Sequence, residues 1–152
     1  MADPVIRFCR LAGDTRVAYS THGSGPLLVC PAWWVSHLER DWKQTAFRLF
    51  FSTLAQHRTV VRYDRPGVGL SSRERHDFTQ ETEVEVLDSI VDGLASPTVD
   101  LLAFSCAAPV ALAWAAANPG RVKKLVFVGA YACGSDLGAD SIRDALVALV
   151  KA

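Results

Sequence analysis

Short apolar runs alternate along this chain with longer segments in which apolar residues recur at helical spacing. Residues 5–11 and 16–20 alternate between apolar and polar side chains, which predicts two strands separated by the turn residues Gly13-Asp14. Apolar runs bounded by turn or polar residues predict four further strands, of the kind that a parallel sheet buries on both faces. These runs are residues 27–30, 59–63, 99–103 and 125–129.

The segments between these strands have the spacing of helices. Residues 42–56 predict an amphipathic helix with apolar residues at Trp42, Ala46, Leu49, Phe50 and Leu54. A second helical stripe consists of Val84, Leu87, Val91 and Leu94. Residues 107–117 predict a third helix, which the stop signal Asn118-Pro119-Gly120 ends, and residues 142–150 predict a fourth.

Strands that alternate with helices favour βαβ units around a mainly parallel sheet. The predicted fold class is therefore α/β, a three-layer sandwich in which a twisted sheet of about six strands carries helices on both faces. The chain contains no internal repeat, low-complexity segment or linker. Residues 1–152 are accordingly expected to form one domain.

The charge balance argues against nucleic-acid and membrane partners. Sixteen basic and sixteen acidic residues cancel, and 50% hydrophobic with 21% charged residues is an ordinary globular composition. The uncharged apolar stretch at residues 101–117 is shorter than the roughly 20 residues that span a bilayer. The sequence does not begin with a basic segment followed by an apolar run, so we expect no secretory signal and a cytoplasmic location.

The cysteine and glycine patterns predict no metal and no organic cofactor. The four cysteines, Cys9, Cys30, Cys106 and Cys133, have no CxxC or CxxH pairing, and we expect reduced thiols. The cluster Gly67-Val68-Gly69 lacks the third glycine of a dinucleotide fingerprint and follows the fourth predicted strand rather than the first. A small-molecule substrate is therefore the only non-protein partner that the sequence suggests.

A serine stands where the buried strand at residues 99–103 passes directly into the helix at residues 107–117. This is the context of a nucleophile elbow, a sharp turn that lifts a serine hydroxyl above the sheet. The residues two before and two after Ser105 must be small, and here they are Ala103 and Ala107 in place of the usual glycines. These residues alone leave a second interpretation open, a buried serine in an alanine-rich turn.

The flanking segments resemble the N-terminal half of the α/β-hydrolase family. Residues 61–71 resemble its Tyr-Asp-x-x-Gly-x-Gly-x-Ser segment, residues 118–129 its elbow helix end and following strand, and residues 22–26 an early turn. Residues 36–42 are similar to a bacterial branch that often occurs beside adenylate-cyclase or helix-turn-helix regulatory domains. The resemblance implies a partial α/β-hydrolase domain over residues 1–152.

The resemblance also implies roles for three residues. Ser105 matches the nucleophile of a serine hydrolase that acts on small ester or amide-type carbonyl substrates by acyl transfer. The backbone N–H of Cys106 matches one oxyanion donor. The second donor corresponds to the N–H of Trp33, because Pro31-Ala32 occupies the place of the family's His-Gly pair.

The sequence supplies no obvious general base for Ser105. In this fold the order along the chain is serine, acid, histidine, yet every histidine here precedes the serine. These histidines are His22, His37, His57 and His76. We therefore expect weak or absent activity from this chain by itself. The alternatives are a non-catalytic binding or regulatory half-domain, and one half of a split hydrolase whose partner supplies acid and base.

The sequence leaves two possible roles open for several residues other than Ser105. His37 is either a substitute base or a loop histidine bound to Glu39 or to backbone. Asp136 is either the acid or the cap of a helix at residues 140–150. Trp33 and Trp34 either floor an acyl pocket or pack against the top of the sheet.

The last predicted strand raises the question of a protein partner. The strand from Leu125 to Gly129 is apolar, and no later segment has the pattern of another strand. An apolar strand at the edge of a sheet exposes unpaired backbone groups that can pair with another chain. We therefore expect a homodimer, a complex with a complementary chain, or aggregation through this strand, and of these we favour the homodimer.

Overall fold

The structure is a computed structural model that describes residues 3–11, 14–74, 77–138, 144–145 and 147–148. Six strands form one sheet in this part of the chain. They are β1 Val5–Arg10, β2 Arg16–His22, β3 Leu27–Cys30, β4 Thr59–Tyr63, β5 Val99–Phe104 and β6 Val122–Val128.

The strand order is β1-β2-β4-β3-β5-β6. β1 and β2 are antiparallel to their neighbours, whereas β4, β3, β5 and β6 run parallel to one another. The prediction of a mainly parallel sheet of about six strands is therefore confirmed. Parallel neighbours place the C-terminal ends of β3 and β5 side by side, which brings the loops after Cys30 and Phe104 together.

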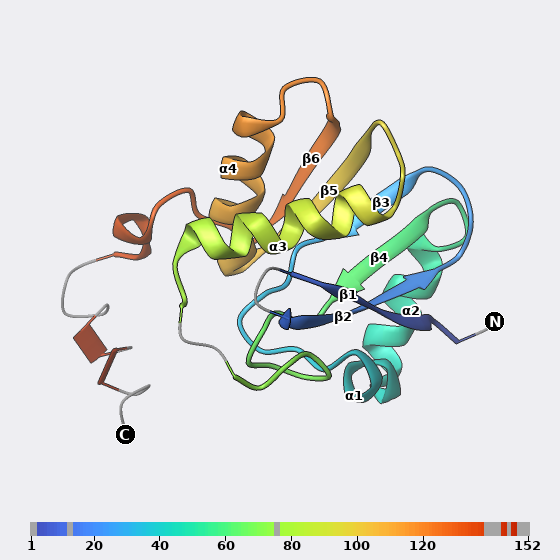
Figure 1. The fold of residues 1–152 in the computed structure, drawn as a ribbon, viewed down its shortest axis with the longest axis horizontal. Coiled ribbons are helices and arrows are strands. Elements are labelled where there is room, and N and C mark those ends of the chain that lie inside the picture. Colours follow the sequence, from blue (N-terminus) through green and yellow to red (C-terminus); the bar gives the residue numbers. More distant parts are fainter. Residues whose placement is uncertain (1–2, 12–13, 75–76, 139–143, 146, 149–152) are drawn as a thin grey trace.

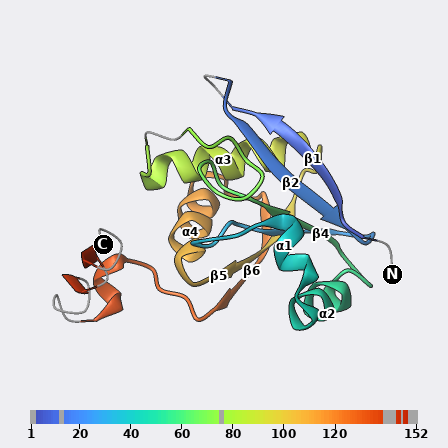
Figure 2. The same ribbon diagram turned by 90° about the horizontal axis from the view of Figure 1, so that it is seen from below.

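Helices cover both faces of the sheet, as predicted. They are α1 Leu38–Lys43, α2 Thr45–Leu54, α3 Gln80–Gly93 and α4 Ala108–Ala117. Figures 1 and 2 show α3 and α4 on one face and α1 and α2 on the other. Two short 3-10 turns, η2 Ser105–Ala107 and η3 Gly134–Leu137, follow β5 and β6 respectively.

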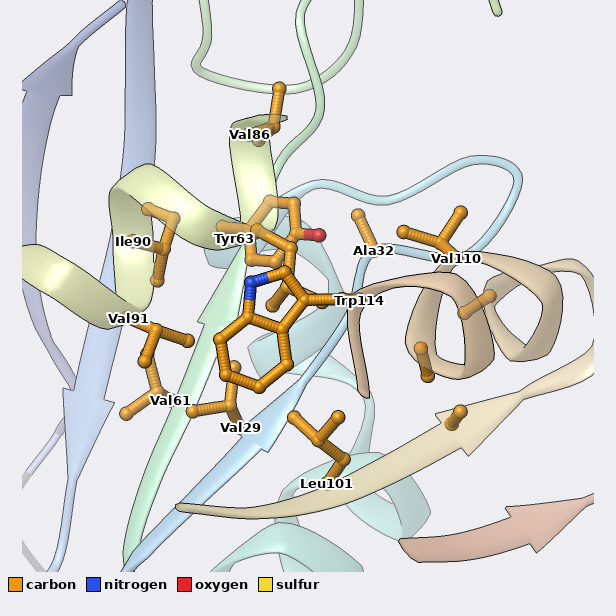
Figure 3. Close-up of a cluster of buried hydrophobic side chains, with 14 of the residues drawn as sticks. Val29, Ala32, Val61, Tyr63, Val86, Ile90, Val91, Leu101, Val110 and Trp114 are labelled. Carbon is orange, nitrogen blue, oxygen red and sulfur yellow. The ribbon is translucent and has the colours of Figure 1, made fainter. Parts of the chain in front are cut away.

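Alternate residues of the central strands build two separate cores, as the two-residue period of a strand requires. Val29, Val61 and Leu101 are fully buried beneath α3 and α4. At the centre of this core the indole of Trp114 lies among valines of the sheet and of α3 (Figure 3). Its Nε1–H donates to Asp88 Oδ1 at 2.8 Å, so the one polar atom of the ring is satisfied.

The predicted helix at residues 42–56 is wrong in its bounds, and of its predicted apolar positions only Trp42 and Leu54 pack against the core. Gln44 has an extended backbone, which divides the segment into α1 and α2. Leu49 and Phe50 are exposed, whereas Phe51 is buried against β3 and β5. The apolar spacing predicted one continuous helix because Gln44 is neither glycine nor proline. Without either residue, the sequence gives no local sign that a helix ends there.

The last strand begins three residues earlier than predicted. Lys124 pairs with Asp100 and Val122 with Val99, so the two lysines belong to β6 rather than to the loop before it. Their side chains are tolerated because β6 lies at the edge of the sheet and both lysines are exposed. The predicted helix at residues 142–150 falls largely outside the described residues.

The four cysteines are free thiols in the structure. Cys30 is fully buried in β3, and this burial raises the pKa of its thiol to about 12. Cys9, in the edge strand β1, is only half-buried, and Cys133 is exposed. Within the described part of the chain, no helix is both long enough and apolar enough to cross a membrane.

Candidate active site

Ser105 lies at the joint between β5 and η2 in a backbone conformation that is unfavourable for any residue except glycine. Its φ angle is +48°, although serine has a Cβ atom. The side chain is exposed, whereas Ala103 and Ala107 on either side are completely buried. This is the geometry expected of a nucleophile elbow, in which a strained turn holds the hydroxyl out of the sheet.

A cavity of about 340 Å³ opens beside Ser105. It brings the three sequence-predicted site residues together, because Ser105, Cys106 and Trp33 all line it. Its remaining walls are aromatic, and sequence reasoning found only one of them. These walls are Trp34, Phe47, Phe51 and Phe104.

The aromatic walls rest on a buried cation. The guanidinium of Arg62 lies 4.2 Å from the ring centroid of Phe47 and 5.0 Å from that of Phe51. Arg62 also donates to Asp41 Oδ2 at 2.8 Å, which neutralises its charge. Burial lowers the pKa of Arg62, and the carboxylate of Asp41 opposes that shift. The pair fixes α1 and α2 against β4, and so fixes the rings that α2 contributes.

Asp64, directly after β4, ties together the loops beside the cavity. Its carboxylate is fully buried and accepts from Ser36 Oγ at 2.6 Å, Leu38 N at 3.2 Å and Leu70 N at 2.9 Å. A Cβ atom on Gly69 would lie 2.0 Å from Asp64 Oδ2, which explains the second glycine of the Gly67-Val68-Gly69 cluster. The cluster is therefore a structural turn around a carboxylate.

Residues 25–150 match the protein family described as the alpha/beta hydrolase fold. The chain belongs to the α/β-hydrolase family. The resemblance that the motifs carried is thus confirmed at the level of the family.

Named relatives of this α/β-hydrolase are enzymes of bacteria. The chain is 32% identical over 124 residues to 2-hydroxy-6-oxo-2,4-heptadienoate hydrolase of Pseudomonas putida, and the aligned residues cover 80% of this chain and 40% of that protein. It is 30% identical over 126 residues to pyrrolizixenacetamide deacetylase of Xenorhabdus hominickii, and the aligned residues cover 82% of this chain and 45% of that protein. The chain therefore spans less than half the length of these curated relatives.

Solved structures agree on the fold. A hydrolase from Pseudomonas aeruginosa PA01 superposes with a TM-score of 0.77 at 23% identity, over 97% of this chain and 53% of that one. The epoxide hydrolase CorEH gives a TM-score of 0.76 at 22% identity, over 92% of this chain and 48% of that one. At this level of identity the likeness establishes the α/β-hydrolase fold alone.

His37 and Asp136, the two residues that the sequence offered as a substitute base and acid, form local caps. His37 Nδ1 accepts from Arg40 N at 3.4 Å at the start of α1, and the histidine is not among the residues that line the cavity. Asp136 Oδ2 accepts from Cys133 N at 2.8 Å, so it caps η3, and the predicted helix at residues 140–150 lies largely outside the described residues.

Cys106 has an arginine beside it that the sequence pattern did not suggest. The Nη2 atom of Arg65 lies 3.8 Å from Cys106 Sγ and 3.5 Å from the carbonyl oxygen of Ala32. Arg65 also pairs with Glu83 of α3 at 3.7 Å. Arg65 thereby links the loop after β3 to the start of the turn after β5, the two segments that border Ser105.

Glycine usually destabilises a helix or strand relative to alanine, but at the strained position of Ser105 we expect it to be the more stable replacement. We expect Ser105→Gly to be more stable than Ser105→Ala by about 1 kcal/mol, because glycine relieves the left-handed conformation at a smaller entropic cost. The matched control is Ala116→Gly, on the exposed face of α4, where glycine should cost about 1 kcal/mol instead. Urea denaturation measures both differences, and equal stability of the two Ser105 variants would show that the turn is not strained.

Proposed function

We propose that this chain carries the nucleophile serine of a hydrolase that acts on small ester, amide or related carbonyl substrates by acyl transfer. The observation that carries the proposal is the exposed Ser105 at a φ angle of +48° beside an aromatic cavity that it lines. The relatives named above are a hydrolase and a deacetylase, which is consistent with attack on a carbonyl carbon.

In the proposed reaction, Ser105 Oγ forms a bond to the substrate carbonyl carbon and gives up its proton to a base. The carbonyl oxygen becomes an oxyanion, which the backbone N–H groups of Cys106 and Trp33 stabilise. The bond from carbon to the leaving oxygen or nitrogen then breaks, and the leaving group takes a proton. Water later attacks the acyl-serine, which releases the acid and restores the hydroxyl.

The described residues place no general base for Ser105 at the cavity. No histidine lines it in that part of the chain. The proposal therefore assigns the base and its acid to groups outside the described residues, on the same polypeptide or on a partner. Loss of a triad member removes several powers of ten in rate, so this chain by itself should react slowly.

The proposal also places the protein in a particular setting. Four free thiols fit a reducing compartment, and we propose the cytoplasm. Within the family, residues 36–42 suggest the bacterial branch that often accompanies adenylate-cyclase or helix-turn-helix regulatory domains.

Covalent labelling with a fluorophosphonate tests the proposed nucleophile. We expect slow addition of one phosphonyl group at Ser105, in which the Oγ–P bond forms and fluoride leaves, and no addition to Ser105→Gly. Intact-protein and peptide mass spectrometry follow the reaction. Ser24→Ala, in an exposed turn, is the matched control and should be labelled like the unmodified chain.

Two results would count against the proposal. Labelling that survives Ser105→Gly would assign the nucleophile elsewhere. Folded chain that resists the probe on long incubation would favour a non-catalytic binding half-domain. Rapid labelling that Ser105→Gly abolishes would support Ser105 as the nucleophile but contradict the expected slow reaction, because it would show that this chain supplies a base. His37→Ala would then test that histidine.

A further inference from the structure

We propose that the cavity beside Ser105 binds a neutral aromatic acyl group and excludes acyl groups that carry a carboxylate. This specificity rests on the proposed function of Ser105. It deepens that function, because it names the class of substrate from the shape and charge of the pocket rather than from the chemistry at the serine.

The aromatic rings of the walls contact one another in edge-to-face and tilted pairs, and an aromatic ligand could make further contacts of the same kind. Trp33 lies edge-on to Phe104, with 5.6 Å between ring centroids and an interplanar angle of 75°. Phe47 and Phe51 lie 4.6 Å apart and are tilted by 47°. Aromatic pairs favour edge-to-face and offset arrangements, and each adds to the effect of burial. A planar ring entering this cavity would meet both faces and edges of its neighbours.

The size of the cavity suits one such group. Its volume of about 340 Å³ is at the lower end of small-molecule sites, which begin at about 300 Å³. Ser105 and Phe104 both line this cavity, so an acyl group bonded to Ser105 Oγ would have the aromatic walls within reach.

In the described part of the chain, the lining has no charged side chain that could pair with a carboxylate on the acyl substituent. Apart from Ser105 and the Cys106 thiol, the lining side chains are aromatic in the part of the chain that the structure describes. An ionised carboxylate that enters an apolar site without a paired partner loses its hydration and gains nothing in return. A neutral ring loses little hydration and gains contact with the walls.

Both arginines near the pocket are already neutralised. Arg62 lies behind the rings of Phe47 and Phe51 and bonds Asp41 at 2.8 Å. Arg65 approaches the pocket rim at Cys106 but pairs with Glu83 at 3.7 Å. Neither is among the lining residues, so neither presents an uncompensated positive charge to a bound anion.

Equilibrium binding of small probes to the folded chain tests this specificity. Ligand-observed NMR titrations at pH 7 would compare acetophenone, benzoate and cyclohexyl methyl ketone. We expect acetophenone to bind about tenfold more tightly than benzoate, and severalfold more tightly than the non-aromatic ketone. The same order should hold for Ser105→Ala, because binding does not require a nucleophile.

Trp34 offers variants that keep the fold, because its side chain lines the pocket yet is 56% exposed. Trp34→Ala should weaken acetophenone binding severalfold, and Trp34→Lys should shift the preference toward benzoate. The neighbouring Val35 is 70% exposed and is not a lining residue, so Val35→Ala is the control that should change neither affinity.

The outcomes separate this inference from the function on which it rests. Benzoate binding as tightly as acetophenone, equal binding of the two ketones, no binding of any probe, or indifference to both Trp34 variants would each overturn the inference. If Ser105 is still labelled by the fluorophosphonate in that case, the proposed nucleophile stands. If the preference holds but labelling fails, the pocket specificity stands and the nucleophile does not.

Discussion

Asp64→Ala is expected to lower the free energy of unfolding by about 3 kcal/mol. The variant removes the acceptor of three hydrogen bonds, from Ser36 Oγ, Leu38 N and Leu70 N, at a site with no exposed surface. Each buried donor left without a partner costs on the order of 1–3 kcal/mol, and part of that cost is shared when neighbouring groups relax. Urea denaturation measures the loss.

The matched control is Asp92→Ala on α3. Asp92 accepts from Arg121 Nη2 at 2.8 Å, yet the carboxylate is exposed and the pair lies at the surface. Exposed pairs contribute less than about 1 kcal/mol, so the same substitution should cost little here. Equal losses for the two variants would mean that the network around Asp64 does not hold the loops together.

The Asp64 network also links stability to the site. Ser36 and Leu38 follow Trp33 and Trp34 along one loop, and the carboxylate of Asp64 fixes this loop against the turn at Leu70. Loosening it should therefore move the tryptophan walls of the cavity as well as lower stability. Under conditions where Asp64→Ala remains folded, its fluorophosphonate labelling would report that displacement.

The elements near the elbow were predictable because their signals are local. The two alanines at positions 103 and 107 reflect a crowded joint, and the structure buries both completely. The apolar runs of the central strands and the stop signal after α4 are likewise properties of short segments. These patterns were sufficient to predict the fold class and the place of Ser105.

The walls of the cavity were not predictable in the same way. Phe47 and Phe51 belong to α2, whose buried face depends on the break at Gln44 and on the contact with Arg62 of β4. Neither cause is visible within the segment, and the helical pattern alone selected Leu49 and Phe50 as apolar positions. The cavity combines side chains from segments that are far apart in the sequence. Their contacts depend on how the sheet arranges β3, β4 and β5, which no single segment reveals.

The role of Asp64 was hidden for a related reason. The resemblance identified the Tyr-Asp-x-x-Gly-x-Gly-x-Ser segment without giving a cause for its residues. In the structure Asp64 binds Leu70 N, Gly69 leaves room for the carboxylate, and Ser71 Oγ accepts from Ala18 N at 2.9 Å. The spacing of the motif is thus the spacing of one turn folded around a buried acid.

The exposed strand β6 predicts self-association of this chain. Within the described residues β6 pairs only with β5, and Val126, Phe127 and Val128 are exposed along it. Both edge strands carry charged residues, but Arg7 and Arg10 are interspersed with the apolar residues of β1, whereas Lys123 and Lys124 stand together at the beginning of β6. Charged side chains discourage pairing between edges, and the apolar end of β6 has none.

We propose that two copies pair through β6 around a two-fold axis, which would make the two β6 strands antiparallel and continue the sheet across the dimer. Sedimentation equilibrium should then give the mass of a dimer at micromolar concentration. Val126→Lys should shift the mass to that of a monomer, because it places a charge in the middle of the pairing segment. Val126 is 47% exposed, so the substitution leaves the core intact.

Val5→Lys on β1 is the matched control for this test. Val5 is 52% exposed on the opposite edge strand, and a lysine there should leave the dimer unchanged. A monomer that persists at high concentration, with both variants identical to the unmodified chain, would rule out pairing through β6. Dissociation by both variants alike would show that added charge, rather than the position of β6, governs association.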